Sequence, residues 1–479
     1  MTTATDGKRA RTALIAYPPS QAYVVDSLRR AFKAKLADWT IVSTRDQLAD
    51  GAKPDLQWSD YDEIDWDWVM DERTLVNSYA IRKALIRKSN LAHTIALHLA
   101  KNPESPLRRA APQTFHFTCS FADELDELLM DDLYEVEQSF TEAENGGEGK
   151  WWILKAALAD KGNGIRLFST RDTLEEIFRE FEPESDDEEE DEDDDEEEGH
   201  GSGANGTSIR ASPEAGRAAM FGADTRVDAT QLREWVIQEY VSNPLLLDPS
   251  ESSDEHGTKF HLRVYVVAVG GVTVYVHHPY LALFASSAYS LPSETASETG
   301  QFDLSAHLTN TCLQTTVLGQ DAPRISVSTL QSMAGKVVLG GPSKGEKLGE
   351  ERIRQIETRV CEAVGEIFKA AAGAGSSFQP LPNAFEIFGV DLLVSDTFEV
   401  SLLEINACPD FGQTGEELQE VIDQLFAHTI DVAVRPFFSA AGDGAASDKE
   451  ALEDSFERLE VGGSRGLKEV MRLQVRKAF

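Results

Sequence analysis

The sequence predicts a mixed α/β (α+β) protein of roughly two or three packed domains, and three observations support this prediction. With 479 residues and a 41% hydrophobic composition, the chain is long and apolar enough to bury a large core. Runs rich in Val, Ile, Leu and Phe alternate with segments in which apolar residues recur at helical spacing. One long stretch has almost no large apolar residues, so a disordered insertion is expected to interrupt the folded parts.

Changes in composition divide the chain into four predicted units. They are an N-terminal α/β domain at residues 1–110, a central lobe at 111–245 that contains the disordered acidic insertion 183–230, a C-terminal lobe at 246–440, and a linker with a charged terminal helix at 441–479.

The first unit is expected to begin with the strand TALIAY from Thr12. A helix of amphipathic spacing follows it, and a second helix is expected from Ser78 to Ala100. This second helix carries a basic cluster that consists of Arg82, Lys83, Arg87 and Lys88. A solvated helix face is the simpler interpretation of the cluster, and contact with an acidic partner or a phosphate is the alternative.

A glycine-containing loop is the first candidate binding element. WWILK reads as a strand that ends at Lys155, and the loop ADKGNGI after it contains Lys161 and Gly162. Glycines let backbone amides approach a phosphate, and lysines neutralise its charge. The Walker pattern GxxxxGK[ST] is absent, so this loop alone is a weak indication of a phosphate site.

The predicted insertion is strongly acidic. Residues Glu184 to Glu198 contain 14 acids in 15 positions, and removing them from the net charge of −38 still leaves −24. Such a chain disfavours nucleic-acid binding. A solubilising insertion is the simpler interpretation, and a docking arm for a basic protein such as a histone is the alternative.

Cysteines and apolar runs indicate the cellular environment. The four cysteines lie far apart and fit no disulfide or zinc spacing. TALIAY is too short for a secretory signal, and the apolar run from Val264 to Val276 is split by two glycines. We therefore expect a cytoplasmic or nucleocytoplasmic protein that binds neither membrane nor nucleic acid, while its oligomeric state is not indicated.

Two further predicted strands carry polar groups suited to a nucleotide. Near the end of WVIQEYV lie Glu239 and Tyr240, which are candidates for a hinge under a purine. In KFHLRVYVVAV, Lys259, His261 and Arg263 alternate on one face of the strand. Three potentially cationic side chains on one face suggest a polyanion, whereas a single one would usually be a salt-bridge partner.

An apolar hairpin near the end of the third unit contains the candidate metal ligands. FEIFGVDLLV and FEVSLLEIN read as strands joined by a turn at 395–397. Glu404 and Asn406 share one face, and the turn brings Asp391 to within about one or two residue pairs of them. Buried carboxylates are costly unless paired or bound to a cation, and this oxygen set suits Mg²⁺. The alternative is a solvated sheet face.

Five segments, in this order, resemble the tubulin–tyrosine ligase family of the ATP-grasp superfamily. They are WWILKAALADKGNGI, VIQEYVSNPLLL, KFHLRVYVVA, HLTNTCLQ and FEIFGVDLLV with VSLLEINACP. The resemblance covers roughly residues 75 to 435. It implies an ATP-grasp fold in which the nucleotide lies between two β-containing lobes, here the central and the C-terminal unit.

The resemblance also implies roles for individual residues. Those implied to bind the nucleotide are Lys155, Lys161, Gly162, Gln238, Glu239, Tyr240, Val241, Lys259, His261, Thr309 and Asn310. Those implied to hold Mg²⁺ are Asp391, Glu404 and Asn406. The catalytic candidates are Lys155 and Arg263, whose guanidinium would grip the transferring phosphoryl group.

The activity implied is that of an ATP- and Mg²⁺-dependent carboxylate–amine ligase that adds an amino acid to a protein. A substrate carboxylate attacks the γ-phosphorus to form an acyl phosphate, and an amine then displaces phosphate to leave an amide bond. The implied partners are ATP, an amino-acid substrate and a protein acceptor, for which tubulin is one candidate.

The sequence departs from the family pattern in two places. His261 replaces the acid of the family's K-F-D-x-R segment, and HHPYLAL at residues 277–283 lacks the arginines of the family's R-x-G-x-x-R hairpin. The resemblance implies that Ala282 takes the place of the arginine that helps bind the amino acid in the family. These departures keep two alternatives open: a nucleotide-binding interaction or scaffold protein whose acidic insertion recruits partners, and a ligase for a small-molecule acid.

Overall fold

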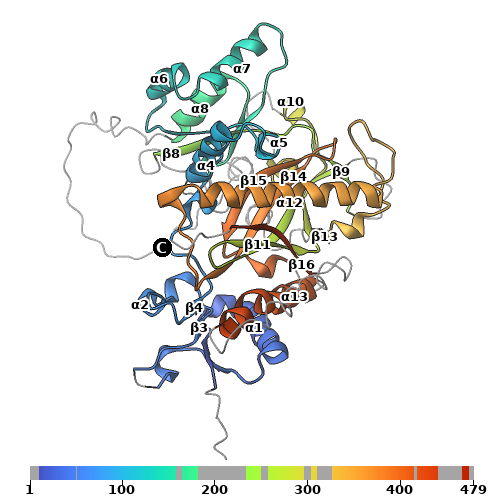
Figure 1. Ribbon diagram of the computed structural model, residues 1–479. Coiled ribbons are helices and arrows are strands. Elements are labelled where there is room, and N and C mark those ends of the chain that lie inside the picture. Colours follow the sequence, from blue (N-terminus) through green and yellow to red (C-terminus); the bar gives the residue numbers. More distant parts are fainter. Residues whose placement is uncertain are drawn as a thin grey trace, which may run out of the picture.

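The computed structural model describes most of the chain (Figure 1). The described residues are 10–49, 51–157, 164–181, 233–249, 257–295, 304–309, 326–414, 418–440 and 466–473. Three predicted site residues, Lys161, Gly162 and Asn310, lie outside these ranges, as does the acidic run from Glu184 to Glu198.

A small parallel sheet forms the N-terminal part of the structure. Its order is β2-β1-β3-β4, with the bounds β1 (Thr12–Leu14), β2 (Thr40–Val42), β3 (Leu56–Gln57) and β4 (Leu75–Val76). The predicted strand from Thr12 is therefore confirmed, and the helix expected after it is α1 (Ala22–Lys35). Helical spacing places Val24, Leu28 and Phe32 of α1 on one buried face.

The predicted second helix is two helices, α3 (Lys83–Ile86) and α4 (Lys88–Lys101). Arg87 separates them because its backbone is extended, with φ −99° and ψ 123°. The basic cluster is divided as well. Arg82 is buried, whereas Lys83 and Arg87 are exposed, so a solvated face accounts for only part of the cluster.

The first β-containing lobe is built on an antiparallel sheet of order β5-β8-β6-β7, in the upper part of Figure 1. Its elements are β5 (Thr114–Thr118), α6 (Leu125–Met130), α7 (Tyr134–Glu144), β6 (Trp152–Ala156), β7 (Arg166–Phe168), α8 (Arg171–Phe181) and β8 (Glu234–Glu239). The helices pack on one face of this sheet, around the buried rings of Trp152, Phe178 and Trp235. WWILK and WVIQEYV thus form neighbouring strands, as their apolar composition predicts.

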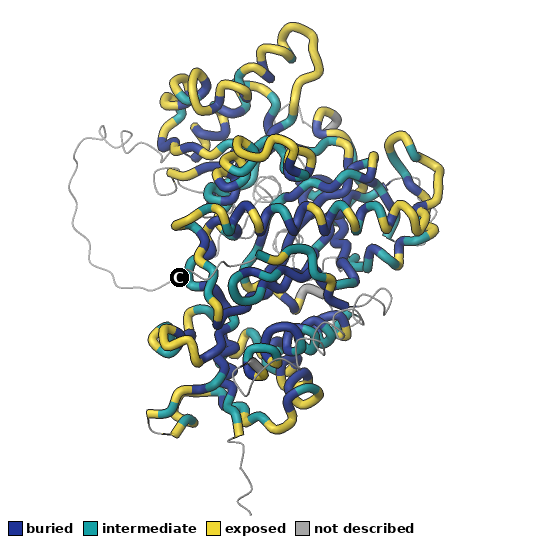
Figure 2. The backbone as a smooth tube through the Cα atoms, viewed as in Figure 1, coloured by how far each residue is buried: buried dark blue, intermediate teal, exposed yellow. Residues whose placement is uncertain are grey.

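The second lobe is an eight-stranded sheet with β10 at its centre. Its strands are β9 (Leu246–Leu247), β10 (Thr258–Val269), β11 (Thr273–His278), β12 (Leu281–Phe284), β13 (Val327–Thr329), β14 (Phe385–Val394), β15 (Val400–Ala407) and β16 (Gly466–Arg472). Both faces of the sheet are covered, so most of its residues are buried (Figure 2). The two β-containing lobes implied by the resemblance are both present.

Alternate residues of β10 pack into two different cores. Leu262, Val264 and Val266 face the long helix α12 (Glu350–Ala372), which crosses the sheet in Figure 1. Tyr265 and Val267 face α1 and α13 (Gln419–Thr429) on the other side. His261 and Arg263 share the second face by alternation, and their side chains define what we call the site face of the sheet.

The expectation of a terminal helix after residue 441 is wrong for the part that the structure describes. Residues 466–472 form β16, which pairs antiparallel with β11, and residues 441–465 lie outside the described ranges. The segment GLKEVMR contains good helix formers, but β11 would otherwise leave an unpaired edge, and pairing there buries Leu467. Long-range strand pairing therefore overrides local helix propensity. None of the described helices is long and apolar enough to span a membrane.

Candidate active site

The hairpin of β14 and β15 brings the three predicted metal ligands together. Asp391 lies directly opposite Glu404, and Gly389 lies opposite Asn406. A bulge between Asp391 and Leu392 shifts the register at this point, which re-aims the side chains that follow it. The predicted spacing of one or two residue pairs is confirmed. The turn at 395–397 is closed by a hydrogen bond from the Phe398 backbone N–H to the Ser395 carbonyl.

Hydrogen bonds connect these three side chains. The amide nitrogen Nδ2 of Asn406 donates to Asp391 Oδ2 and to Glu404 Oε1, both at 3.2 Å. Asp391 is almost completely buried, with 4% of its surface exposed. If the side-chain amide of Asn406 is turned over, its oxygen lies between the same two carboxylates.

The chemistry of this donor set fits Mg²⁺. Two carboxylates and an amide oxygen are hard ligands, and Mg²⁺ usually takes one or two carboxylates and shares the rest of its coordination with water and substrate phosphates. Among the described residues, no three His, Cys, Asp or Glu side chains are grouped to hold a metal ion. The set therefore suits a cation shared with a phosphate substrate better than a closed structural metal site.

Arg263 is the cation that contacts Asp391 most closely. It lies opposite Asp391 in the pairing of β10 with β14. Its Nε donates to Asp391 Oδ1, and its Nη2 donates to Asp391 Oδ2 at 3.0 Å. Such a bidentate pair fixes the guanidinium plane. The predicted catalytic arginine and the predicted metal ligand are therefore direct partners in this structure.

His261 lies beside this pair in its neutral form. Burial and the neighbouring charge of Arg263 lower the pKa of His261 to about 3. Its Nδ1 is 2.6 Å from the Thr309 hydroxyl, and its Nε2 is 3.6 Å from Asp391 Oδ1. His261 and Thr309, both predicted to contact the nucleotide, thus contact each other at the end of the site.

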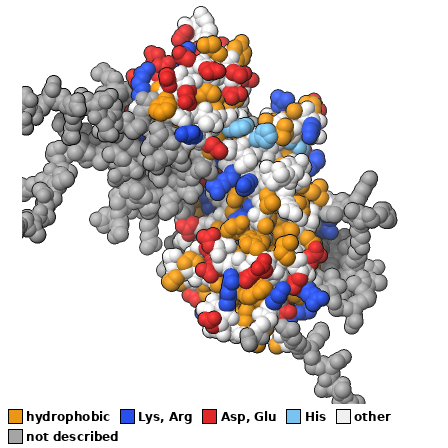
Figure 3. All heavy atoms as spheres, turned by 90° about the vertical axis from the view of Figure 1, so that its left-hand side faces the viewer, with side chains coloured by type: hydrophobic (Ala, Val, Ile, Leu, Met, Phe, Trp, Pro, Cys, Tyr) orange, Lys and Arg blue, Asp and Glu red, His pale blue; other side chains and the backbone are white. Residues whose placement is uncertain are grey.

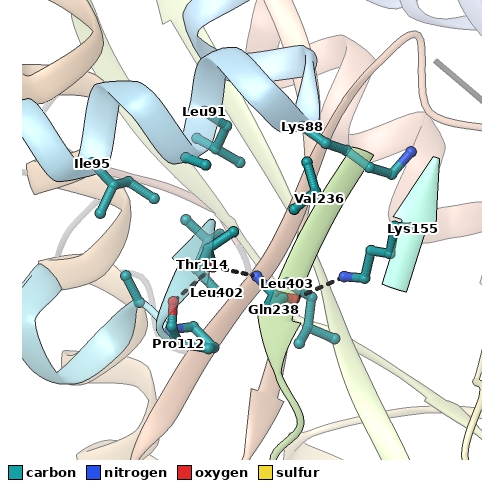
Figure 4. Close-up of a pocket in the computed structure, with 12 residues that line it drawn as sticks. Lys88, Leu91, Ile95, Pro112, Thr114, Lys155, Val236, Gln238, Leu402 and Leu403 are labelled. Carbon is teal, nitrogen blue, oxygen red and sulfur yellow. Dashed lines mark hydrogen bonds between the residues drawn. The ribbon is translucent and has the colours of Figure 1, made fainter. Parts of the chain in front are cut away.

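Lys155 and Gln238 meet across neighbouring strands of the first lobe. Lys155 Nζ donates to Gln238 Oε1 at 2.7 Å, and Gln238 Nε2 donates to the Thr114 hydroxyl at 3.2 Å, as the dashed lines in Figure 4 show. Burial lowers the pKa of Lys155 to about 8, with Glu404 raising it and Lys88 lowering it. Lys155 is therefore within electrostatic reach of a carboxylate from the second lobe.

Lys259 and Tyr240 form a second contact between the lobes. Lys259 Nζ donates to the Tyr240 hydroxyl at 3.0 Å and lies 4.3 Å from the centre of its ring. The hydroxyl is also 2.9 Å from His307 Nδ1. Burial, with a contribution from the charge of Lys155, lowers the pKa of Lys259 to about 7. Lys155 is thus close enough to Lys259 to disfavour its charged form.

The remaining predicted hinge residues complete the end of β8. Glu239 forms an ion pair of 3.4 Å with Lys150, and its amide donates to the carbonyl of Gln113. Val241 follows Tyr240 where the strand ends. The predicted nucleotide residues that are described thus come from both lobes, with Thr309 in the second lobe, between β12 and β13.

Lys88, for which the sequence left contact with a phosphate as an alternative, lines a pocket with two of the predicted site residues. It begins α4 and lines one pocket together with Lys155, Gln238 and the two residues at the β15 bulge, Leu402 and Leu403 (Figure 4). Its place in a basic cluster suggested a solvated face, and only the docking of α4 against the first lobe's sheet reveals the contact.

We expect Lys88→Ala to weaken ATP binding about five- to ten-fold, because one positive charge near the phosphates is lost. Lys83→Ala is the matched control, since Lys83 is exposed on the neighbouring helix α3. Calorimetry of both variants would measure the difference. Equal affinities for the two variants would remove Lys88 from the site.

We also expect ATP affinity to fall at least about ten-fold between pH 7 and pH 9. The pKa values of Lys155 and Lys259 are about 8 and about 7, so both amines lose their protons across this range. Bound phosphates favour the charged forms, so binding at pH 8 requires proton uptake. Calorimetry in two buffers of different ionisation enthalpy measures that uptake, and Lys259→Met should reduce it. An affinity independent of pH would contradict this assignment.

The structure corrects the position assigned to the missing arginine. Ala282 pairs with Leu262 and faces the α12 core, away from Arg263. The residues of β12 on the site face are Leu281, opposite Arg263, and Leu283, opposite His261. An arginine that reached the site from β12 would have to stand at one of these two positions, and both are buried leucines.

Comparisons with known proteins agree with one another. The family described as "Tubulin-tyrosine ligase family" matches residues 71–441. The chain is 37% identical over 425 residues to the probable tubulin–tyrosine ligase PBY1 of Saccharomyces cerevisiae, which covers 87% of this chain and 51% of that protein. It is 36% identical over 390 residues to the probable tubulin–tyrosine ligase C12B10.04 of Schizosaccharomyces pombe. That match covers 80% of this chain and 84% of the relative. The chain thus spans about half the length of the S. cerevisiae relative.

One solved structure is similar over nearly the whole chain. It is the C-terminal domain of K. lactis Pby1, described as an ATP-grasp enzyme interacting with the mRNA decapping enzyme Dcp2. The TM-score is 0.61 at 29% sequence identity, and the match covers 97% of this chain and 100% of that one.

Proposed function

Because this chain belongs to the tubulin–tyrosine ligase family and has the ATP-grasp fold, we propose that it is an ATP- and Mg²⁺-dependent ligase that adds an amino acid to a protein. The observation that carries the proposal is the convergence of Asp391, Glu404 and Asn406 with Arg263 on the site face. A binding scaffold would not need a buried carboxylate, a half-buried carboxylate and a half-buried guanidinium at one point, because removing charged groups from water costs free energy.

The reaction needs positioning and charge neutralisation more than covalent help from the protein. Asp391, Glu404 and Asn406 would hold Mg²⁺, whose charge lowers the repulsion between the phosphates and an incoming carboxylate. Lys155 and Lys259 would bind the phosphate oxygens and gain protons as they do so. Because both amines are partly neutral without a ligand, their charge would appear only when it is needed.

Arg263 would stabilise the transferring phosphoryl group and the acyl phosphate. The Asp391 carboxylate fixes its guanidinium plane, so little reorganisation is required when charge develops. Arg263 donates to both carboxylate oxygens of Asp391, so a cation at this site would share Asp391 with the arginine. That competition offers a means of coupling nucleotide binding to the orientation of the catalytic arginine.

The acceptor that fits the charge distribution is an acidic or neutral segment of protein, with tubulin as one candidate from the names of the relatives. On the face seen in Figure 3, Lys and Arg side chains gather between the acid-rich upper lobe and the lower part of the molecule. Lys83 and Arg87 are exposed on α3 and just after it. These charges offset the repulsion expected between an acidic chain and an acidic acceptor.

A second candidate function is an interaction protein that binds nucleotide. The observation in its favour is the apolar pair Leu281 and Leu283 at the positions of β12 that face the site. The K. lactis relative is described as interacting with Dcp2, so an mRNA-decapping component is a candidate partner for this chain as well.

Amino-acid-dependent release of ADP separates these two functions. We expect ADP release to rise at least about ten-fold when a protein acceptor and the correct amino acid are both present, and mass spectrometry should detect the added residue on the acceptor. ATP binding without any such stimulation, across all twenty amino acids and tubulin and decapping-component acceptors, would favour the interaction protein.

A further inference from the structure

Three buried side chains are joined by hydrogen bonds where the two lobes meet, and we call them the hinge network. Lys259 Nζ donates to the Tyr240 hydroxyl at 3.0 Å, and that hydroxyl is 2.9 Å from His307 Nδ1. Lys259 belongs to β10, Tyr240 follows β8, and His307 follows the short helix η6 (Leu304–Ala306). Only 5%, 7% and 2% of their respective surfaces are exposed. Solvent therefore contributes little to the hydrogen bonding of these groups, and each depends on its neighbours.

The number of hydrogens in the hinge network decides the direction of its bonds. A charged lysine has donors and no acceptor, so Lys259 uses the hydroxyl oxygen of Tyr240 as its acceptor. The one hydrogen of that hydroxyl then points to a different acceptor, and an unprotonated Nδ1 of His307 lies within hydrogen-bond distance. A protonated Nδ1 would instead compete with the lysine for the same oxygen. An unprotonated Nδ1 therefore favours the charged form of Lys259.

Two tyrosine rings hold the imidazole of His307 in place. Tyr240 and Tyr289 pack edge-on against it, with ring centres 5.8 and 5.7 Å from its own. Leu304 and Leu308, on either side of His307 in the sequence, pack with Tyr240 in one apolar cluster. The imidazole thus has little freedom to turn Nδ1 away from the Tyr240 hydroxyl.

Other groups also act on the charge of Lys259. Burial lowers its pKa, and Lys155 of β6 lowers it further. His261, two positions along β10, is neutral. Burial raises the pKa of Tyr240, and Tyr289 adds to this effect, so Tyr240 keeps its hydrogen at neutral pH. The Tyr289 hydroxyl donates its own hydrogen to a backbone carbonyl at 2.6 Å. A lysine in these surroundings stays charged only if every acceptor near it is correctly directed.

We propose that His307 is a positioning residue of the nucleotide site: its unprotonated Nδ1 accepts the hydrogen of the Tyr240 hydroxyl, which turns the hydroxyl oxygen toward Lys259 and supports the charged form of that lysine. His307 acts through Tyr240, so another side chain that accepts a hydrogen bond at the same place should replace it. The proposal rests on the proposed function, because Lys259 needs its charge for the nucleotide.

Two substitutions of His307 test this. Leucine has no acceptor, whereas the amide oxygen of asparagine occupies nearly the same place as Nδ1 and does not titrate. Calorimetry would measure the binding of ATP with Mg²⁺ to the full chain from pH 6 to pH 9, for the wild type and both variants. The ratio of variant to wild-type affinity at each pH cancels the titration of ATP itself.

The expected result is a pH-dependent loss for leucine and a rescue by asparagine. We expect His307→Leu to bind ATP about five- to ten-fold more weakly than the wild type between pH 7 and pH 8, because lowering the pKa of Lys259 by about one unit removes most of its charged form. The difference should shrink toward pH 6, where Lys259 is charged in both proteins. His307→Asn should stay within about two-fold of the wild type at every pH.

A purely structural role for His307 gives a different result. Lost packing would weaken binding by the same factor at every pH, and asparagine would not repair it. Either of these outcomes, or a wild-type pH profile in a His307→Leu variant that thermal unfolding shows to be folded, would overturn the proposal. Tyr289→Phe tests the other hydroxyl near Tyr240. If this variant shifts the pH profile and His307→Leu does not, Tyr289 is the acceptor and the assignment to His307 is wrong.

A double variant tests whether His307 acts through Tyr240. Tyr240→Phe removes the hydroxyl that connects the two ends of the network, so a further change at His307 should have no effect of its own. We expect the double variant Tyr240→Phe with His307→Leu to bind ATP within about two-fold of Tyr240→Phe alone. Two effects that multiply would mean that His307 acts on the nucleotide by another route, and would contradict the proposal.

The two proposals can fail separately. If asparagine restores the pH profile that leucine loses, but no amino acid stimulates ADP release, the role of His307 stands and the ligase function fails. If an amino acid stimulates ADP release while His307→Leu keeps the wild-type pH profile of ATP binding, the ligase function stands and His307 has no positioning role.

Discussion

Replacing Glu404 by glutamine is expected to lower ligase turnover by about a thousand-fold and to remove the Mg²⁺ dependence of ATP binding. The substitution keeps the shape of the side chain and one oxygen but removes its charge. Arg263 already compensates Asp391, so Glu404 supplies the remaining negative charge of the three ligands. A neutral residue there leaves the site too weakly charged to take Mg²⁺ from water.

Calorimetry of ATP binding, with and without Mg²⁺, is the measurement for Glu404→Gln. The matched control is Glu362→Gln, which makes the same chemical change at an exposed position of α12 and should behave like the wild type. If Glu404→Gln binds ATP with the Mg²⁺ response of the wild type, the three residues do not form a metal site. If neither the wild type nor Glu404→Gln binds ATP, the nucleotide site itself is absent and the interaction-protein function takes precedence.

The hairpin could be predicted closely because everything that defines it is local. The run Phe385–Val394 is apolar except for Glu386 and Asp391, the turn residues follow directly, and alternation fixes which side chains share a face. These facts place Asp391 within one or two residue pairs of Glu404, and their direct opposition depends on the bulge, because Leu392 already pairs with Leu402. The bulge after Asp391 could not be predicted, because it depends on how β15 also packs against its neighbours.

The partners of the site residues could not be predicted from the sequence, because they are distant along the chain. Arg263 and Asp391 are 128 residues apart, and only the pairing of β10 with β14 joins them. Lys88 comes near Lys155 through the docking of α4 on another sheet. Composition identifies such groups as candidates, and topology decides which of them meet.

Local propensity failed where a long-range contact outweighed it. The segment GLKEVMR contains good helix formers, but as β16 it pairs with the otherwise free edge of β11. Arg82 appeared to belong to a surface cluster, yet it is the buried partner of Glu386, 304 residues later in the chain. In both cases the unpaired backbone or charge of a distant segment determined the outcome.

Removal of Arg82 is expected to have the largest effect on stability. Its Nε lies 2.8 Å from Glu386 Oε1, and the two side chains are only 9% and 3% exposed. The guanidinium also donates to the Tyr79 carbonyl and lies over the ring of Tyr61. Breaking such a pair from one side leaves a buried charge without compensation, which costs about 3–5 kcal/mol. Urea unfolding of Arg82→Met should measure a loss in that range, while Arg87→Met, at an exposed position, should lose less than about 0.5 kcal/mol.

The pH dependence and a double variant distinguish a lost ion pair from lost packing. Burial already raises the pKa of Glu386 to about 7 in spite of the charge of Arg82. Without Arg82 the carboxyl pKa rises further, so the folded state binds a proton that the unfolded state, with a pKa of about 4.3, releases. Stability of Arg82→Met must therefore fall as pH rises from 5 to 8, more steeply than that of the wild type. Adding Glu386→Leu removes the orphaned carboxylate and should recover most of the loss at pH 8. If the double variant is as unstable as Arg82→Met at every pH, packing of the arginine side chain, and not its charge, holds the N-terminal strands against β14.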